Sequence, residues 1–180
     1  YNTDNPNVIN SEGAFLNIKR LNEFSSKFFN IINLIKTFID NSKDNEAVFI
    51  YSDQLKVGVK LFATILEENG MKRYVGNSNY TNFLTNPNDI SLFKNKYQYI
   101  YVDGSTDNQV VNKWFSDYNN NKVKNVKVIL GSDKVSQGIN LFRIREVHIL
   151  NPWFNLNKVE QVIGRATRQK SHSELNSKKR

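Results

Sequence analysis

Short apolar runs alternate with amphipathic segments along most of this 180-residue chain. The firmest apolar runs occupy residues 47–51, 98–102, 126–130 and 146–150, and a weaker one occupies 72–75. Runs of this length and composition are typical of strands that are covered on both faces of a parallel sheet. Because segments with helical spacing lie between them, the pattern predicts a doubly wound α/β fold, with a mainly parallel sheet and helices on both faces.

Helix boundaries can be predicted at three places. Ser25 or Ser26 is a candidate N-cap for a helix whose apolar residues recur every three or four positions up to Ile39. Gly70 is a stop signal for a helix that follows the strand at 47–51. Thr106, with Gln109 three residues later, predicts a capping box at the start of a further helix.

Two polar stretches interrupt this pattern. Residues 1–24 are rich in Asn, so we expect a lead-in arm or linker that precedes a domain spanning 25–180. Residues 76–96 are also Asn-rich and contain Pro87, which indicates a polar insertion on the surface.

Composition narrows the possible functions. The chain has no cysteine and only two histidines, His148 and His172, so disulfides, thiolate catalysis and a protein-built metal site are not expected. A formal charge of +8 favours polyanionic partners such as nucleic acid. No apolar run reaches the roughly 20 residues that span a bilayer, and no signal peptide is evident, so we expect a soluble, intracellular protein without a membrane partner. Because the chain begins without Met, we also expect a fragment of a longer protein.

The strongest chemical signal lies in residues 157–169. On a helix, Gln161, Gly164, Arg165 and Arg168 share one face, while apolar residues occupy the opposite face. No carboxylate on the helix lies at the right spacing to neutralise either arginine. Gly164 costs about 1 kcal/mol relative to Ala, which suggests that a ligand approaches the backbone there. A polyphosphate fits this face, and the alternative is that acids from elsewhere in the fold pair with the arginines.

Polar turns follow the predicted strands at residues 52–54, 103–106, 131–140 and 151–157. In a doubly wound sheet, ligands bind in the crevice beyond the carboxyl ends of the strands. We therefore expect these turns to gather at one edge, beside the arginine helix.

In this order, the segments resemble the second RecA-like domain of superfamily 2 helicases and translocases. Q-V-I-G-R-A-T-R at 161–168 is similar to motif VI, S-D-K-V-S-Q-G-I-N at 132–140 to motif V, and A-V-F-I-Y-S at 47–52 to motif IV. Y-V-D-G-S-T at 101–106 resembles the turn between motifs IV and V. The run at 164–175 further resembles helicase-related ATPases of poxviruses and other large cytoplasmic DNA viruses, which implies host cytoplasm or virion as the location.

The resemblance implies an ATP-facing group of residues. By position, Arg168 corresponds to the arginine finger, Arg165 to its companion, and Gln161 to a residue near the same phosphate. Asp133 corresponds to an acid that contacts the ribose, with a helix cap as the alternative. Gly138 corresponds to a close approach beside the nucleotide, with an ordinary turn glycine as the alternative.

The resemblance also implies a nucleic-acid face, which would contact the backbone of DNA or RNA. Ser52, Gly104, Thr106 and Ser132 match positions where family members meet that backbone through hydroxyls and main-chain N–H groups. For Thr106 a capping role is equally open. Trp153 is interpreted as a core or interface aromatic rather than a base-stacking residue, and His148 as a satisfied core residue.

Two motifs of the family are missing from the sequence: the phosphate loop G-x-x-x-x-G-K-[ST] and the acidic D-E-x-x box. In the family both belong to the first, N-terminal RecA-like domain, which would hold ATP and Mg²⁺. The resemblance therefore implies the C-terminal motor domain of an ATP-dependent helicase or translocase that is inactive without that partner domain. The rival reading is a non-catalytic, basic nucleic-acid-binding or assembly module with a helicase-like fold.

Overall fold

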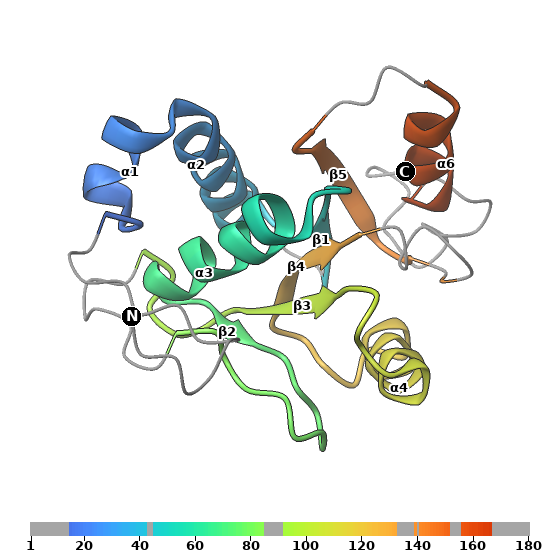
Figure 1. Ribbon diagram of the computed structural model, residues 1–180. Coiled ribbons are helices and arrows are strands. Elements are labelled where there is room, and N and C mark those ends of the chain that lie inside the picture. Colours follow the sequence, from blue (N-terminus) through green and yellow to red (C-terminus); the bar gives the residue numbers. More distant parts are fainter. Residues whose placement is uncertain are drawn as a thin grey trace.

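The computed structural model describes residues 15–42, 45–84, 92–132, 139, 141–151 and 156–166. Its centre is a sheet of five strands in the spatial order β2-β3-β4-β1-β5, and all four pairings are parallel (Figure 1). The strands are β1 (Ala47–Tyr51), β2 (Lys72–Arg73), β3 (Gln98–Val102), β4 (Val126–Gly131) and β5 (Ile144–Ile149). This arrangement confirms the predicted doubly wound, mainly parallel α/β fold of the RecA-like type.

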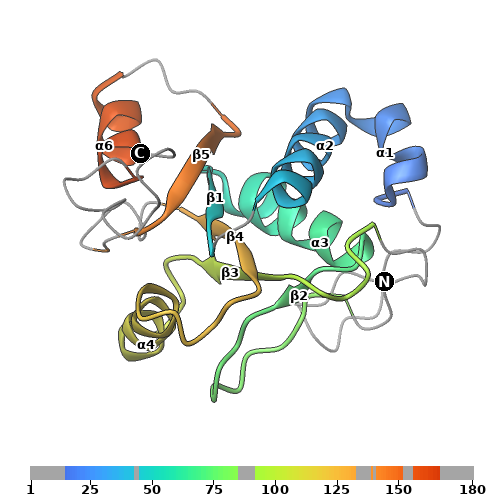
Figure 2. The same ribbon diagram turned by 180° about the vertical axis from the view of Figure 1, so that it is seen from behind.

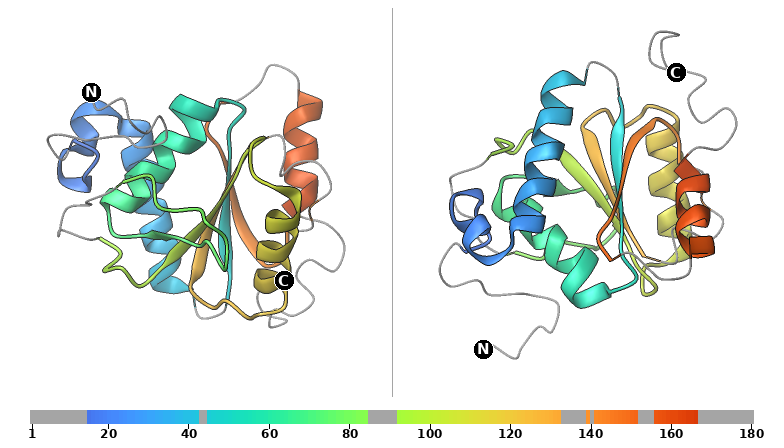
Figure 3. Two further views of the ribbon diagram at one scale, coloured as in Figure 1. Left: turned by 60° about the horizontal axis from the view of Figure 1, so that its bottom comes forward. Right: turned by 90° about the horizontal axis from the view of Figure 1, so that it is seen from above.

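Helices cover both faces of the sheet because alternate residues of the central strands point to opposite sides. In β1, Val48 and Ile50 belong to the apolar cluster beneath α2 (Ser26–Asn41) and α3 (Leu61–Glu68). Phe49 belongs to the cluster beneath α4 (Asn108–Asn119) and α6 (Leu156–Ala166). Figure 2 gives the reverse view, and Figure 3 shows the two helical layers on either side of the sheet. Every residue of β1 is buried, which explains its continuous apolar run.

Two of the predicted helix boundaries are confirmed. Ser25 is the N-cap of α2, and its hydroxyl accepts a hydrogen bond from Phe28 N at 3.3 Å. Gly70 follows α3 with a φ of +86°, a conformation that glycine adopts without strain. The helix that ends there starts with a π-helical turn, η1 (Leu55–Lys60), which leads directly into α3. None of the helices in the described ranges is long and apolar enough to span a membrane.

The predicted capping box at Thr106 is wrong. The N-cap of α4 is Asp107, whose carboxylate accepts hydrogen bonds from Gln109 N at 2.8 Å and Val110 N at 3.2 Å. The Thr106 hydroxyl instead bonds within the preceding turn, where it accepts from Asp103 N and donates to Asp103 Oδ1. The helix cap therefore lies one residue later than expected, at Asp107.

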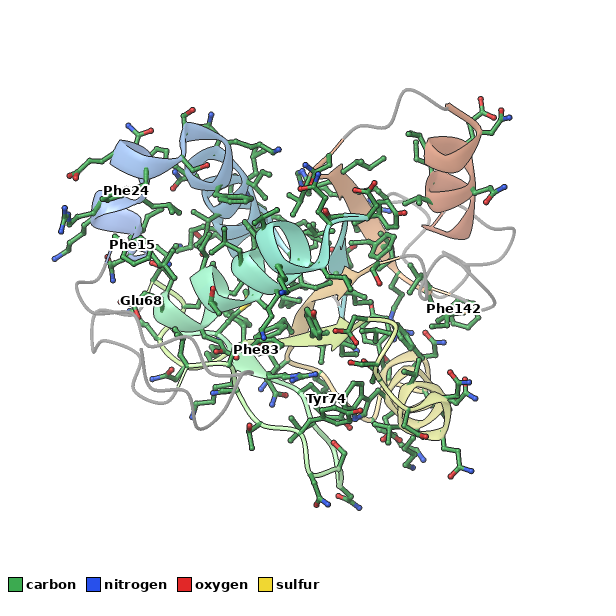
Figure 4. The ribbon with its side chains drawn as sticks, viewed as in Figure 1. Phe15, Phe24, Glu68, Tyr74, Phe83 and Phe142 are labelled. Atoms are coloured by element: carbon green, nitrogen blue, oxygen red, sulfur yellow. The ribbon has the colours of Figure 1, made fainter. Side chains whose placement is uncertain are left out.

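Residues 15–24 pack against the domain instead of forming a linker. They include helix α1 (Ile18–Phe24), whose Leu21 is buried, together with Leu16. The side chain of Asn69, at the end of α3, accepts from Ile18 N at 2.8 Å and donates to Leu16 O at 3.0 Å. The rings of Phe15 and Phe24 meet edge to face at the outer end of this layer (Figure 4). Among the described residues, the packed domain therefore begins at residue 15 and not at residue 25.

The stretch 76–96 contributes three apolar side chains to the protein interior, although the sequence favoured a polar surface insertion. Phe83, Leu84 and Phe93 are all buried. The carboxylate of Glu67 in α3 accepts hydrogen bonds from Phe83 N at 3.0 Å and Leu84 N at 2.7 Å. One acid on a helix therefore anchors this segment, a long-range contact that polar composition cannot reveal. Residues 85–91 lie outside the described ranges.

His148 lies on β5, the strand at one edge of the sheet, and is half-buried. Its Nε2 is 3.1 Å from a carboxylate oxygen of Glu146, so the histidine is satisfied by a neighbour on its own strand. The contact agrees with the expectation that His148 is satisfied within the fold, but the residue lies at the sheet edge and not in the core.

Candidate functional site

Polar turns leave four neighbouring strands at the same edge of the sheet. Along this edge the turns follow the spatial order of the strands: residues 103–106 after β3, 131–132 at the end of β4, 52–54 after β1 and 150–151 after β5. Main-chain hydrogen bonds join them: Ser132 N donates to Val102 O at 3.3 Å, and Ser52 N donates to Gly131 O at 3.2 Å. The described parts of the four predicted turns are therefore brought together, as expected from parallel strands.

Ser52 connects the central turn to the turn after β5. Its hydroxyl donates to Asn151 Oδ1 at 2.8 Å and accepts from Gln54 N at 3.1 Å, and the residue is fully buried. A bound strand could reach this hydroxyl only by displacing Asn151 and Gln54. The geometry thus gives Ser52 a role in holding two turns in place, and its predicted contact with nucleic acid stays a prediction.

Gly58 makes the position of Ser52 possible. A Cβ added at Gly58 would lie 2.8 Å from Ser52 Cβ and closer still to Ser52 Oγ. The π-helical turn η1 therefore approaches β1 so closely that only glycine fits. Sequence reasoning overlooked Gly58, although a glycine in the interior of an amphipathic helix was a usable signal.

The turn after β3 is built around Asp103. Its Oδ1 accepts from Ser105 N at 2.9 Å, and its Oδ2 accepts from Tyr101 OH at 3.0 Å. Thr106 is buried and closes the turn, because its Oγ1 accepts from Asp103 N at 3.1 Å. Gly104 and Ser105 are exposed at the tip, and a Cβ on Gly104 would meet nothing within 4 Å. The tip therefore offers main-chain groups to a ligand, while Asp103 and Thr106 fix its shape.

Asp103 stays ionised at neutral pH. Its partial burial would by itself raise the pKa, but hydrogen bonds from Ser105, Tyr101 and Thr106 outweigh burial and lower the pKa of Asp103 below its ordinary value of 3.8. Burial, together with the same carboxylate, raises the pKa of Tyr101. Asp103 thus acts as an ionised acceptor for the surrounding donors, a role that the sequence motif did not assign.

Helix α6 lies next to β5 and presents one face to the core and another to solvent (Figure 1). Val162 is fully buried in the cluster under α4 and α6, whereas Gln161 and Gly164 are exposed. The predicted division of the helix is correct at these three positions. Ile163, which the helical wheel placed on the apolar face, is 41% exposed, so the apolar stripe is narrower than expected.

Several predicted residues cannot be placed. Asp133, Gly138, Trp153 and Arg168 lie outside the described residues, as does the side chain of Arg165. Ser132 is buried at the end of β4, next to the start of this gap. The structure thus brings together Ser52, Gly104, Thr106 and Ser132 along one edge and places the backbone of the arginine helix beside β5.

Comparison with known proteins supplies the family. The family model described as "Helicase conserved C-terminal domain" matches residues 27–170. This chain belongs to the helicase C-terminal domain family. The match includes the motif-like segments on β1, after β3, after β4 and on α6, which confirms the resemblance to superfamily 2 helicases.

Relatives of this helicase C-terminal domain occur in large DNA viruses. The chain is 30% identical over 208 aligned residues to "Putative ATP-dependent RNA helicase L377" of Acanthamoeba polyphaga mimivirus, covering 99% of this chain and 18% of the relative. It is 28% identical over 175 residues to "Nucleoside triphosphatase I" of Choristoneura fumiferana entomopoxvirus, covering 87% of this chain and 26% of that protein. The chain thus spans about a fifth to a quarter of the length of these relatives.

A solved structure supports the fold of this helicase C-terminal domain. The crystal structure of the C-terminal part of the Fun30 ATPase domain superposes with a TM-score of 0.60 at 20% identity, covering 90% of this chain and 40% of that one. At this level of identity, the likeness concerns the fold.

Proposed function

We propose that this domain is the C-terminal half of an ATP-dependent helicase or translocase motor. In this proposal, α6 supplies Arg165 and Arg168 to an ATP molecule held with Mg²⁺ by an N-terminal RecA-like domain, and Asp133 and Gly138 adjoin the same nucleotide. The turns after β3, β4 and β1 contact the backbone of a DNA or RNA strand.

The observation that carries the ATP half of the proposal is the orientation of α6. Val162 anchors the helix in the core, and Gln161 and Gly164, which share the predicted face with the arginines, point to solvent. A Cβ on Gly164 would meet no described atom within 4 Å, so nothing described in this chain requires a glycine there. A ligand approaching the exposed backbone accounts for a residue that otherwise costs about 1 kcal/mol.

The chemistry follows from the arginine side chain. A guanidinium stays charged at all physiological pH values and can donate two parallel hydrogen bonds to a phosphoryl group. Placed at a γ-phosphate, it stabilises the charge that develops as the phosphoryl group transfers, which is worth about 10³–10⁵ in rate. The remaining requirements, a phosphate cradle and a metal-binding acid, would come from the partner domain.

The ATP half is tested by Arg168→Ala in a protein that contains this chain and its ATP-binding domain. The expected result is loss of nucleic-acid-stimulated ATP hydrolysis with nucleic-acid affinity largely retained. Normal turnover by this variant would overturn the assignment and favour a non-catalytic, basic module, to which the charge of +8 also points.

The nucleic-acid half is tested at the tip of the 103–106 turn. Thr106 N donates to Asp103 O at 3.2 Å, so Gly104 occupies the second position of a four-residue turn, where proline is well tolerated. Gly104→Pro removes the N–H and should weaken strand binding about 10- to 100-fold, as expected for a hydrogen bond to a charged phosphate. Gly104→Ala, which keeps the N–H and adds a methyl group in open space, is the matched control. Equal affinity of the Pro and Ala variants would exclude this contact.

A further inference from the structure

A cavity of about 230 Å³ lies beside the 103–106 turn, between that turn, η1 and the segment that follows β2. Asp103, Ser105 and Thr106 line one side of it, and Lys60, Arg73 and Tyr80 line the others. The cavity therefore adjoins the turn proposed to contact the nucleic-acid backbone. That turn is the one motif-like segment that contributes to its lining.

One wall of this cavity is a buried arginine, Arg73, packed among aromatic rings. The residue is only 7% exposed, and its guanidinium lies over the rings of Tyr80 at 5.0 Å, Phe83 at 4.8 Å and Tyr101 at 5.1 Å. Figure 4 labels Phe83 beside β2 and β3. Within the described part of the chain, the guanidinium donates to Thr81 O at 3.1 Å, and its Nε has no hydrogen-bond partner. The three rings and the opposite charge of Glu67 stabilise this buried cation, which forms part of the cavity lining.

The chemistry of the lining favours a heterocyclic base over a phosphate. Lys60 and Arg73 are cationic and Asp103 is anionic, so the lining carries charges of both signs and is not a purely cationic phosphate site. The amide of Asn82 uses Oδ1 to accept from Arg73 N at 3.1 Å, which leaves its NH₂ group as a donor. A nucleobase carries donors, acceptors and a flat apolar face, and proteins bind unstacked bases with this mixture of aromatic, Arg and amide groups.

Size also separates the candidates. Sites for drug-sized ligands occupy about 300–1,000 Å³, so a cavity of about 230 Å³ suits one base and not a whole nucleotide. The backbone of a strand lying on the Gly104–Ser105 tip would bring its bases within reach of this opening.

We propose that this cavity holds a single nucleobase, turned out of a strand whose backbone lies on the 103–106 turn. This inference rests on the proposed nucleic-acid contact and adds base recognition to it. The backbone contacts alone carry no sequence information, whereas a base in this cavity would make binding depend on the presence and identity of one base.

The test compares two labelled single strands of equal length by fluorescence anisotropy: oligothymidylate and the same deoxyribose-phosphate chain without bases. The unaltered chain should bind the base-bearing strand at least about fivefold more tightly, the lower end of the effect of stacking one base on aromatic side chains. Equal affinity for both strands would overturn base recognition and leave the backbone contact intact. Failure to bind either strand would overturn both proposals.

Tyr80→Ala removes one wall of the cavity and should bring the affinity ratio close to one without changing the affinity for the abasic strand. Tyr97→Ala, another half-buried tyrosine outside the cavity, is the matched control and should keep the ratio. Because Tyr80 also packs against Trp114 at 5.5 Å, a second variant is needed. Asn79→Trp blocks the cavity from an exposed lining position and should abolish the ratio in the same way. Retention of the ratio in folded Tyr80→Ala and Asn79→Trp proteins would refute the proposal.

Lys60→Met distinguishes a base from a phosphate in the cavity. If a phosphate bound there, the variant would weaken both strands equally and reduce the salt dependence of binding by about 0.7 in log–log slope. With a base in the cavity, the salt dependence for the abasic strand should stay the same. A reduced slope for the abasic strand would contradict the base assignment.

Discussion

The close approach of Gly58 to Ser52 makes a specific prediction for Gly58→Ala. The new methyl group would lie 2.8 Å from Ser52 Cβ, well inside van der Waals contact, and closer still to the hydroxyl that binds Asn151. Neither side can yield easily, because Ser52 is fully buried and η1 continues into α3. We expect the substitution to push η1 away from β1 and to disturb the junction of the turns after β1 and β5.

The magnitude follows from three contributions to the free energy of unfolding. Overpacking a well-packed interior costs about 1–3 kcal/mol, and loss of the Ser52–Asn151 hydrogen bond costs about 0.5–1.5 kcal/mol. The higher helix propensity of Ala offsets about 0.8–1.0 kcal/mol of this. The net prediction is a destabilisation of about 0.5–4 kcal/mol.

Urea unfolding of this chain measures the effect, with the second helical glycine as a control. Gly164→Ala gains the same propensity, but its Cβ meets no described atom within 4 Å, so this variant should be as stable as the unaltered chain or more stable. Ser52→Gly in the Gly58→Ala background removes the colliding side chain and should restore part of the loss, as a coupling energy in a double-mutant cycle. A Gly58→Ala protein as stable as Gly164→Ala, with no coupling to Ser52, would refute the steric argument.

Three further predictions concern the acids Glu67 and Asp103. Glu67→Gln should destabilise the chain by about 1–3 kcal/mol in urea unfolding, because its NH₂ group would face donors from Phe83, Leu84 and Tyr99 that now point to a carboxylate; unchanged stability would mean that Glu67 does not anchor this segment. Burial raises the pKa of Glu67 above its ordinary value of 4.5, although hydrogen bonds from Tyr99 and Leu84 oppose the shift. The folded state therefore binds the proton of Glu67 more tightly than the unfolded state does. The free energy of unfolding should fall as the pH rises from 4.5 through the folded-state pKa. The contribution of Glu67 to the pH dependence of the unfolding free energy should be absent in Glu67→Gln. An identical pH dependence in both proteins would contradict the raised pKa of Glu67. The pH dependence that Asp103 contributes has the opposite sign. Because its pKa is lowered, its contribution to the free energy of unfolding is present above pH 3.8 and lost as the pH falls through the folded-state pKa. Below pH 3.8, Asp103→Asn should therefore lose less additional stability than the unaltered chain.

The central sheet was predictable because its strands are buried on both faces. Four almost continuous apolar runs, separated by helical periodicity, require parallel strands with helices on either side, and β1, β3, β4 and β5 lie within two residues of the expected ranges. The meeting of the turns at one edge followed from the same logic, since parallel strands end on the same side.

The errors arose where a side-chain hydrogen bond, local at Thr106 and long-range at Glu67, overrode the signal of the sequence. Thr106 has the sequence pattern of a helix cap, but its hydroxyl donates a hydrogen bond to the carboxylate of Asp103, and Asp107 caps α4 instead. The 76–96 stretch is polar in composition, yet Glu67 draws the backbone of Phe83 and Leu84 into the interior. Neither competition is visible in local propensity or periodicity.

The candidate site was predictable to the level of segments rather than atoms. The described parts of the motif-like turns lie at one edge of the sheet and α6 lies beside β5, as expected. The roles of Gly58, Asn151 and Arg73, however, depend on contacts between residues distant in sequence. Gly58 had a local signal, a costly glycine within a helix. Arg73 had none, because its aromatic neighbours come from β3 and from the segment after β2.

Chemical rescue of Arg168→Ala tests the central claim most directly. In a protein that contains this domain and the proposed ATP-binding domain, the variant should lower nucleic-acid-stimulated kcat by about 10³–10⁵. Free guanidinium at non-denaturing concentrations should restore part of the lost rate, because it supplies the missing cation at the phosphoryl group. Asn157→Ala, at an exposed position on the same helix, is the control and should hydrolyse ATP normally. Undiminished hydrolysis by Arg168→Ala, before any guanidinium is added, would contradict the assignment of this domain as the arginine-supplying half of the motor.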